Sequence, residues 1–123
     1  MMKKLVLTGA AGRLGSYLRE PLSKMCQELV STDIVDDIGK LYEGESYAKA
    51  DVAVYDQIAP LLEGADMVVH FGAIVDEKPF EELLGPNFVG SYNVWEAAYQ
   101  HGLQRVVYAS SIHAVGMHKK CDF

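Results

Sequence analysis

The feature that most constrains the fold is a glycine run between a short apolar segment and an amphipathic one. Gly9-Ala10-Ala11-Gly12-Arg13-Leu14-Gly15 directly follows the apolar run Lys3–Thr8. That run is typical of a buried strand, and Leu14–Met25 has apolar residues at helical spacing, at 14, 18, 22 and 25. Glycines let a backbone approach a ligand closely, and a helix N-terminus offers unpaired N–H groups, so this strand–turn–helix predicts a pyrophosphate-binding loop. The alternative is a plain tight turn.

The rest of the chain alternates short strands with amphipathic stretches. Strands are expected at Glu28–Thr32, Ser46–Val52, Asp66–Phe71 and Arg105–Ala109, and helices at Asp56–Glu63 and Phe80–Gln100. Pro21 should kink or shorten the first helix, and Gly85-Pro86 is a candidate for a break in the last. The alternation predicts an α/β fold, a doubly wound parallel sheet (Rossmann fold) of about five strands with flanking helices. Such sheets bind ligands at the carboxyl ends of their strands.

Asp33 closes the second strand, 18 residues after Gly15. A carboxylate there can accept hydrogen bonds from both ribose hydroxyls of a dinucleotide and repels a 2′-phosphate, which favours NAD over NADP. Arg13 is the opposing feature, because a basic residue in the glycine loop could hold a 2′-phosphate. Its alternative role is a solvated side chain at the start of a helix. We predict NAD as the cofactor.

Charge and cysteine content exclude several classes of protein. The net charge of −6 argues against nucleic-acid or anionic-membrane partners. The longest apolar stretch, Met67–Val75, is interrupted by His70 and is far shorter than the ~20 residues that span a bilayer. Cys26 and Cys121 make no disulfide framework, and no targeting segment is recognisable, so a cytoplasmic location is expected.

The remaining possible metal ligands, the aromatic residues of the last helix and His70 are each expected to have structural roles. His113, His118, Cys121 and Asp122 match no zinc spacing, and no metal is predicted. Trp95 lies at helical spacing with Tyr92 and Tyr99, which indicates core or subunit-interface residues rather than a binding site. His70 is interpreted as a packed histidine beside the cofactor rather than an acid or base.

Several segments occur in the order of a known family. They are Thr8-Gly9-x-x-Gly12-x-x-Gly15, Asp51-Val52 after the third strand, His70-Phe71-Gly72-Ala73, the helix Asn87–Ala98, and Val107-Tyr108-Ala109-Ser110-Ser111. Over nearly the whole chain they resemble the extended short-chain dehydrogenase/reductase family, also called the NAD-dependent epimerase/dehydratase family. The resemblance implies an NAD site formed by Gly9, Ala11, Gly12, Arg13, Leu14, Gly15, Asp33, Asp51, Val52, Phe71, Gly72, Ala73 and Asn87.

Within that family the closest resemblance is to members that oxidise galacturonate or glucuronate to the aldarolactone with NAD. It is carried by Gly9–Gly12, Glu77–Glu81 and Ser110–His113. It implies that Ser111 is catalytic, holding the reacting oxygen, and that Val75, Ser111, Ile112 and His113 face the substrate. Val75 and Ile112 stand where a serine and an asparagine are expected. Nucleotide-sugar epimerases, dehydratases or reductases therefore stay open as an alternative, as does a non-catalytic NAD sensor or scaffold.

The resemblance also implies a tyrosine base four residues before a lysine. No lysine in residues 1–123 has a tyrosine at that distance. We therefore expect residues 1–123 to be the N-terminal portion of an NAD-binding domain, without its remaining strands and C-terminal substrate lobe, and to be inactive alone. A homo-oligomer is expected by analogy. The alternative role of Ser111 is to satisfy backbone at a strand end, and that of His113 is a loop histidine bonded to backbone.

Overall fold

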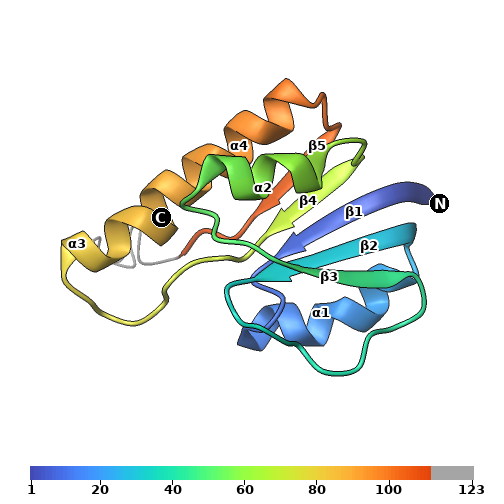
Figure 1. Ribbon diagram of the computed structural model, residues 1–123, viewed down its shortest axis with the longest axis horizontal. Coiled ribbons are helices and arrows are strands. Elements are labelled where there is room, and N and C mark those ends of the chain that lie inside the picture. Colours follow the sequence, from blue (N-terminus) through green and yellow to red (C-terminus); the bar gives the residue numbers. More distant parts are fainter. Residues whose placement is uncertain (112–123) are drawn as a thin grey trace, which may run out of the picture.

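The computed structural model describes residues 1–111, and its strands form one parallel sheet. The strands are β1 (Met2–Thr8), β2 (Cys26–Asp33), β3 (Glu45–Lys49), β4 (Met67–His70) and β5 (Arg105–Tyr108). Helix α1 (Arg13–Ser23) follows β1, α2 (Tyr55–Leu62) follows β3, and α3 (Phe80–Leu83) and α4 (Gly90–Gln100) follow β4, while β2 leads to β3 without a helix. The strand order is β3-β2-β1-β4-β5, all parallel (Figure 1). The predicted α/β fold with a doubly wound sheet of five strands is confirmed.

The sheet is covered on both faces, and each face has its own apolar core. Figure 1 shows α1 on one face and α2 with α4 on the other. Val6 and Val68 face α2 and α4, whereas Leu5 and Leu7 belong to the second cluster, with Leu22 of α1. Side chains alternate in direction along a strand, so continuous apolar strands such as β1 and β4 fill both cores. None of the helices within residues 1–111 is long and apolar enough to cross a membrane.

The strand order reverses at β1, which pairs with β2 on one side and with β4 on the other. The chain builds β1, β2 and β3 outward, then crosses back to place β4 and β5 beyond β1. Loops that leave β1 and β4 therefore diverge from each other at their carboxyl ends. This is where an open α/β sheet binds its ligand.

The first helix buries only part of the predicted face, since Leu22 is buried and Leu18 packs against the same core. Its apolar spacing suggested a face through Leu14, Leu18, Leu22 and Met25, but Leu14 is 61% exposed and Met25 48%. The buried positions are Gly15, Arg19 and Leu22. Pro21 lies inside the helix, which continues to Ser23 and ends two residues before the predicted Met25.

The long helix predicted over residues 80–100 is divided, as Gly85-Pro86 suggested. Its middle, Leu84–Val89, forms a π-helical segment between α3 and α4. Pro86 has no N–H to donate to an α-helical carbonyl, which favours a wider turn there. The third strand ends at Lys49, earlier than predicted, and its last bond to β2 is the one from Ala50 N–H to the Asp33 carbonyl.

The aromatic residues of α4 do not enter the core. Tyr92, Trp95 and Tyr99 are 66%, 49% and 79% exposed, so of the two predicted roles, core and subunit interface, the first is excluded and the second stays a prediction. Trp95 contacts Tyr108 of β5, with ring centroids 6.4 Å apart. The buried side of α4 instead consists of the small residues Gly90, Ala97 and Ala98 together with Val94 and Asn93.

Candidate functional site

The glycine loop after β1 is packed too closely for side chains. Gly9 has a φ of +71°, and a Cβ there would lie 2.6 Å from the Phe71 carbonyl carbon. A Cβ at Gly15 would lie 2.0 Å from the Gly9 carbonyl oxygen. Gly12 begins α1 without a side-chain cap, so the first N–H groups of the helix have no acceptor within it. The loop thus offers backbone donors and a positive helix end to an anion.

Asp33 at the end of β2 faces this loop. Its Oδ2 accepts a hydrogen bond of 2.9 Å from Ala11 N–H, and its Oδ1 one of 2.7 Å from Ile34 N–H. Its backbone carbonyl accepts bonds from Ala50 N–H and the Tyr47 hydroxyl, which fix the strand end. Burial, followed by the charges of nearby aspartates, raises the pKa of Tyr47, so this hydroxyl stays protonated and donates. The carboxylate is thereby held at the edge of the glycine loop.

Asp51 and Val52 form a short loop after β3. The Asp51 Oδ1 accepts a bond of 2.9 Å from Ala53 N–H, and Asp51 N–H donates to Gln57 Oε1 at 2.9 Å. Val52 is buried, at 8% exposure, and its carbonyl accepts a bond of 2.9 Å from Asn93 Nδ2. The structure places this loop on the same carboxyl edge of the sheet as Asp33.

Thr8 and His70 form a buried polar pair between β1 and β4. The Thr8 hydroxyl oxygen accepts bonds from the N–H groups of Phe71 and Gly72, at 3.1 and 3.0 Å. Both of its lone pairs are then used, so its proton is donated to His70 Nδ1, 2.6 Å away. Burial lowers the pKa of His70 to about 4. His70 is therefore a neutral, packed imidazole that stacks on Tyr108, as its interpretation as a structural histidine requires.

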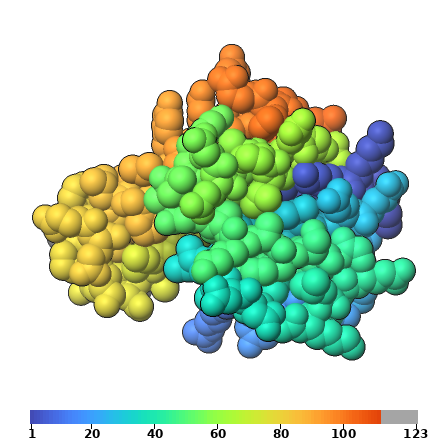
Figure 2. Space-filling model, viewed as in Figure 1, coloured from blue at the N-terminus to red at the C-terminus, as the bar shows by residue number. Residues whose placement is uncertain are grey.

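The segment after β4 runs along the opening of the glycine loop and then leaves the body of the domain. Gly72 lies against Thr8, where a Cβ would be 3.2 Å from the hydroxyl oxygen, and Ala73 is exposed. Asn87 holds the segment, because its amide accepts from Ile74 N–H at 2.7 Å and donates to the Ile74 carbonyl at 2.9 Å. Figure 2 shows this part of the chain, in yellow and gold, as a lobe that stands out from the remaining surface.

The residues predicted to face a substrate are only partly described. Val75 is 92% exposed in the segment after β4, and Ser111 is exposed three residues beyond the end of β5. β5 pairs with β4, so Ser111 follows a strand at the same edge as the glycine loop. Ile112 and His113 lie outside the described residues.

A buried ion pair on the other side of the domain was not predicted. Arg19 Nε donates to Glu45 Oε1 at 2.7 Å, and its two terminal nitrogens donate to the carbonyls of Ile38 and Lys40. Burial by itself would raise the pKa of Glu45, but hydrogen bonds from Arg19, Tyr42 N–H and Ser31 hold it below its usual range. The pair fastens the loop 34–44, which follows Asp33, to α1. The only sequence signal was an arginine three residues before Leu22 on the buried face.

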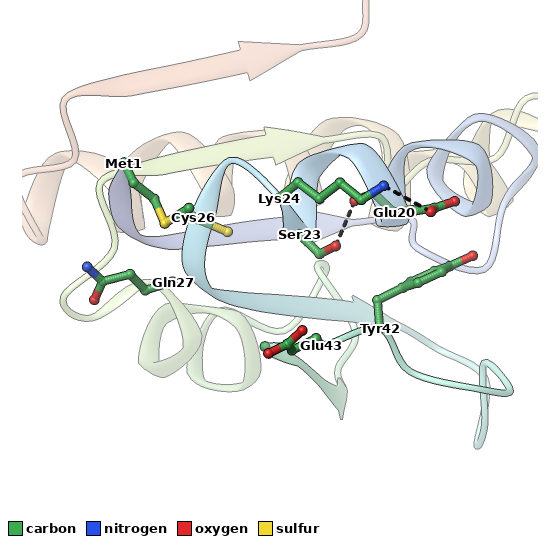
Figure 3. Close-up of a pocket in the computed structure, with 9 residues that line it drawn as sticks. Met1, Glu20, Ser23, Lys24, Cys26, Gln27, Tyr42 and Glu43 are labelled. Carbon is green, nitrogen blue, oxygen red and sulfur yellow. Dashed lines mark hydrogen bonds and ion pairs between the residues drawn. The ribbon is translucent and has the colours of Figure 1, made fainter.

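A hollow of about 770 Å³ lies away from these loops, between the end of α1 and the start of β2 (Figure 3). Exposed side chains such as Glu20 and Lys24 line it, and they pair with each other. Cys26, at its base, donates its thiol to the Leu22 carbonyl, and burial raises the pKa of that thiol, which keeps it unreactive. No cluster of metal-binding side chains occurs within residues 1–111.

The carboxyl edge of the sheet thus gathers three elements within the described part of the chain. They are a glycine-lined helix start, a carboxylate at the end of the next strand, and the loop that follows the third strand. A Cβ at Gly9 or Gly15 would clash with backbone, at distances as short as 2.0 Å, so only glycine allows the loop to pack this closely. This arrangement fits the diphosphate and ribose of a dinucleotide.

Known proteins with the same arrangement match almost the whole chain. Residues 6–122 match the 3-beta hydroxysteroid dehydrogenase/isomerase family. Uronate dehydrogenase of Pseudomonas syringae pv. tomato is 42% identical over 95% of this chain and 42% of its own length. The corresponding protein of Agrobacterium fabrum is 40% identical over 98% of this chain and 45% of its own. The chain therefore spans less than half the length of these relatives.

The structure superposes on solved enzymes with similar sequences. A mutant of uronate dehydrogenase from Agrobacterium tumefaciens, complexed with NAD, matches with a TM-score of 0.84 and 40% identity. The match covers 90% of this chain and 42% of that one.

Proposed function

Since this chain belongs to the 3-beta hydroxysteroid dehydrogenase/isomerase family, we propose that its glycine loop and Asp33 bind NAD at the carboxyl edge of the sheet. The observation that carries the proposal is the bond between Ala11 N–H and Asp33 Oδ2, 2.9 Å long, which joins the predicted phosphate loop to the predicted ribose acceptor. The absence of room for a Cβ at Gly9 and Gly15 supports it. A similar protein has been solved as a complex with NAD.

The proposed reaction is oxidation of a hexuronate, galacturonate or glucuronate, to the aldarolactone. NAD, when bound, would accept the hydride. Ser111, which follows β5 beside β4, would form a hydrogen bond with the reacting oxygen of the substrate. The similarity to uronate dehydrogenases over 95% of the chain supports this substrate class. Val75 and Ile112 keep a nucleotide-sugar epimerase, dehydratase or reductase as the second candidate.

We further propose that residues 1–123 are the N-terminal part of the NAD-binding domain. The described sheet has five strands, and the relatives are more than twice as long as the matched region. The base and its lysine partner would then lie outside residues 1–123, and these residues alone would not transfer hydride. The exposed aromatic residues of α4 support self-association of the protein through that helix.

Isothermal titration of the full-length protein with NAD and NADP tests the cofactor proposal. NAD should bind, and Asp33→Ala should weaken it by about tenfold or more, since hydrogen bonds to a charged group contribute about 1.5–3 kcal/mol. Asp36→Ala is the matched control, because this exposed carboxylate pairs with Lys49 and should not affect NAD binding. Equal or tighter binding of NADP by the wild type would overturn the cofactor proposal.

NADH absorbance with galacturonate and glucuronate tests the substrate proposal. Turnover of either, and none by residues 1–123 alone, is expected. Activity on a nucleotide sugar without activity on either uronate would establish the second candidate instead. Binding of NAD with no turnover of any of these substrates would favour a sensor or scaffold.

A further inference from the structure

We infer that α4, through Asn93, positions the loop 50–54 for the adenine half of the cofactor. The inference rests on the proposed function and on the family resemblance, which implies that Asp51 and Val52 are the pair that contacts the adenine. Asn93 does not reach the cofactor in this scheme and acts only through the backbone of Val52. It is therefore a positioning residue.

The contact between Asn93 and the loop is buried and directional. Asn93 is 6% exposed, and its Nδ2 donates to the Val52 carbonyl at 2.9 Å. Asn93 is separated from Val52 by 41 residues and lies on another element, so this bond fixes the loop relative to α4 and not to its own strand. Burying an amide without a hydrogen-bond partner is costly, so the bond to Val52 stabilises Asn93 in this position.

Val52 is also held by shape. A Cβ at Gly90 of α4 would lie 2.5 Å from Val52 Cγ2, and one at Gly72 would lie 3.5 Å from Val52 Cγ1. The valine is wedged between the helix and the segment after β4. Its side chain and its carbonyl are thus both fixed by α4, one through packing and one through a hydrogen bond.

The same helical run holds the second loop of the site. Asn87, in the π-helical segment, makes its two bonds to the backbone of Ile74, and Asn93 follows in α4. One continuous helical run, residues 84–100, therefore contacts both the loop after β3 and the segment after β4 and fixes their positions. The other end of the loop after β3 is tied to the sheet by the bond from Ala50 N–H to the Asp33 carbonyl, 2.9 Å long.

The test compares the two halves of the cofactor in titrations of the full-length protein with NAD, ADP and nicotinamide mononucleotide. Asn93→Asp keeps the side-chain volume but replaces the donor with an acceptor, and Asn93→Ala removes it. Both variants should raise the Kd for ADP by about tenfold, because that is the effect expected from losing one buried hydrogen bond. The Kd for nicotinamide mononucleotide should change less than about twofold. Gln100→Ala, on the exposed side of α4, is the control and should change neither.

If Asn93 had a purely structural role, its variants would weaken the binding of ADP and of nicotinamide mononucleotide equally. That result, or unchanged ADP binding, would overturn the inference. If the Asn93 variants do not fold, Gln57→Ala releases the same loop from its exposed side, since Gln57 Oε1 accepts from Asp51 N–H. Selective weakening of ADP by Gln57→Ala supports the inference, and its absence contradicts it. Failure of the wild type to bind NAD or ADP would instead refute the proposed function, and the inference with it.

Discussion

Single residues determine which groups near the site are protonated and how they are hydrogen-bonded, and Thr8 is the clearest case. Its hydroxyl accepts from Phe71 and Gly72 and donates to His70, so one side chain ties the end of β1 to the loop after β4. A protonated His70 would lose the Thr8 bond, because Nδ1 would become a donor facing a donor. Protonation and folding are therefore linked at this position.

The unfolding free energy should depend on pH through His70. Because burial holds the folded pKa at about 4, below its ordinary 6.5, the unfolded chain binds a proton between these values and the folded chain does not. The free energy of unfolding should therefore fall, by up to about 3 kcal/mol, as the pH is lowered from 6.5 to 4. Urea unfolding at several pH values measures this slope. His70→Asn keeps an acceptor for Thr8 but cannot titrate, so its slope in this window should be much smaller; an equal slope would exclude His70 as the cause.

Gly15 should tolerate no side chain. In Gly15→Ala the new Cβ would lie 2.0 Å from the Gly9 carbonyl oxygen, which is backbone and cannot move aside without opening the loop. We expect a loss of more than about 2 kcal/mol in unfolding free energy and at least about a tenfold weaker NAD binding. Gly85→Ala is the matched control, because its Cβ would meet only Ala53 at an ordinary 3.6 Å. Thermal unfolding and titration of both variants decide the matter, and similar losses in the two would show that the glycine loop is not specially crowded.

At the scale of elements, the Arg19–Glu45 pair joins α1 to β3. Removing one partner leaves an uncompensated buried charge, so Glu45→Ala should cost about 3–5 kcal/mol. Asp36→Ala removes an exposed carboxylate that pairs with Lys49 in solvent, so it should cost far less than Glu45→Ala. Because the pKa of Glu45 is held below 4.5, its contribution is present above that pH and is lost as the pH falls further. Chemical denaturation at pH 7 compares the variants, and equal costs would mean that the buried pair is not tightly coupled.

The elements themselves could be predicted well where their pattern depends on local sequence. The apolar runs of β1 and β4 and the glycines that follow β1 determine a strand and a turn without help from distant residues. The burial of Arg19 in α1 could not be predicted, because this side chain is charged and enters the interior only to meet Glu45, 26 residues away. The same holds for Asn93, whose partner carbonyl belongs to a loop 41 residues earlier.

At the scale of the whole molecule, the sequence predicted the sheet and the position of Asp33 but not the contacts between loops. The α/β alternation determines a parallel sheet, and such a sheet brings its carboxyl ends to one edge. Which loop packs against which helix depends instead on contacts between segments that are far apart in the sequence. The family resemblance is confirmed, whereas the roles of Ser111, Val75, Ile112 and His113 stay predictions.

The assembly should depend on the aromatic face of α4. Trp95 and Tyr99 are exposed on the same helix, and apolar side chains gathered in this way commonly mark a contact between proteins. If two copies of the protein meet there, Trp95→Glu should convert an oligomer to monomers, because it places a charge in the contact. Sedimentation of the full-length protein checks this, with Gln100→Glu on the same helix as control. A wild type that is monomeric, or a variant that still associates, would contradict the assignment of this face.

The wide turn at Leu84–Val89 has a consequence for the length of the chain at this point. A π-helical turn is an α-helix that has gained one residue, and each residue of an α-helix advances its direction by about 100°. The wide turn absorbs that residue, so the helix before it and the helix after it keep almost the same angular phase. Asn87 lies inside the turn, and its two bonds to Ile74 depend on that geometry. Deleting one residue of the turn should therefore weaken the hold on the segment after β4 and leave the contacts of Gly90 and Asn93 with Val52 in place.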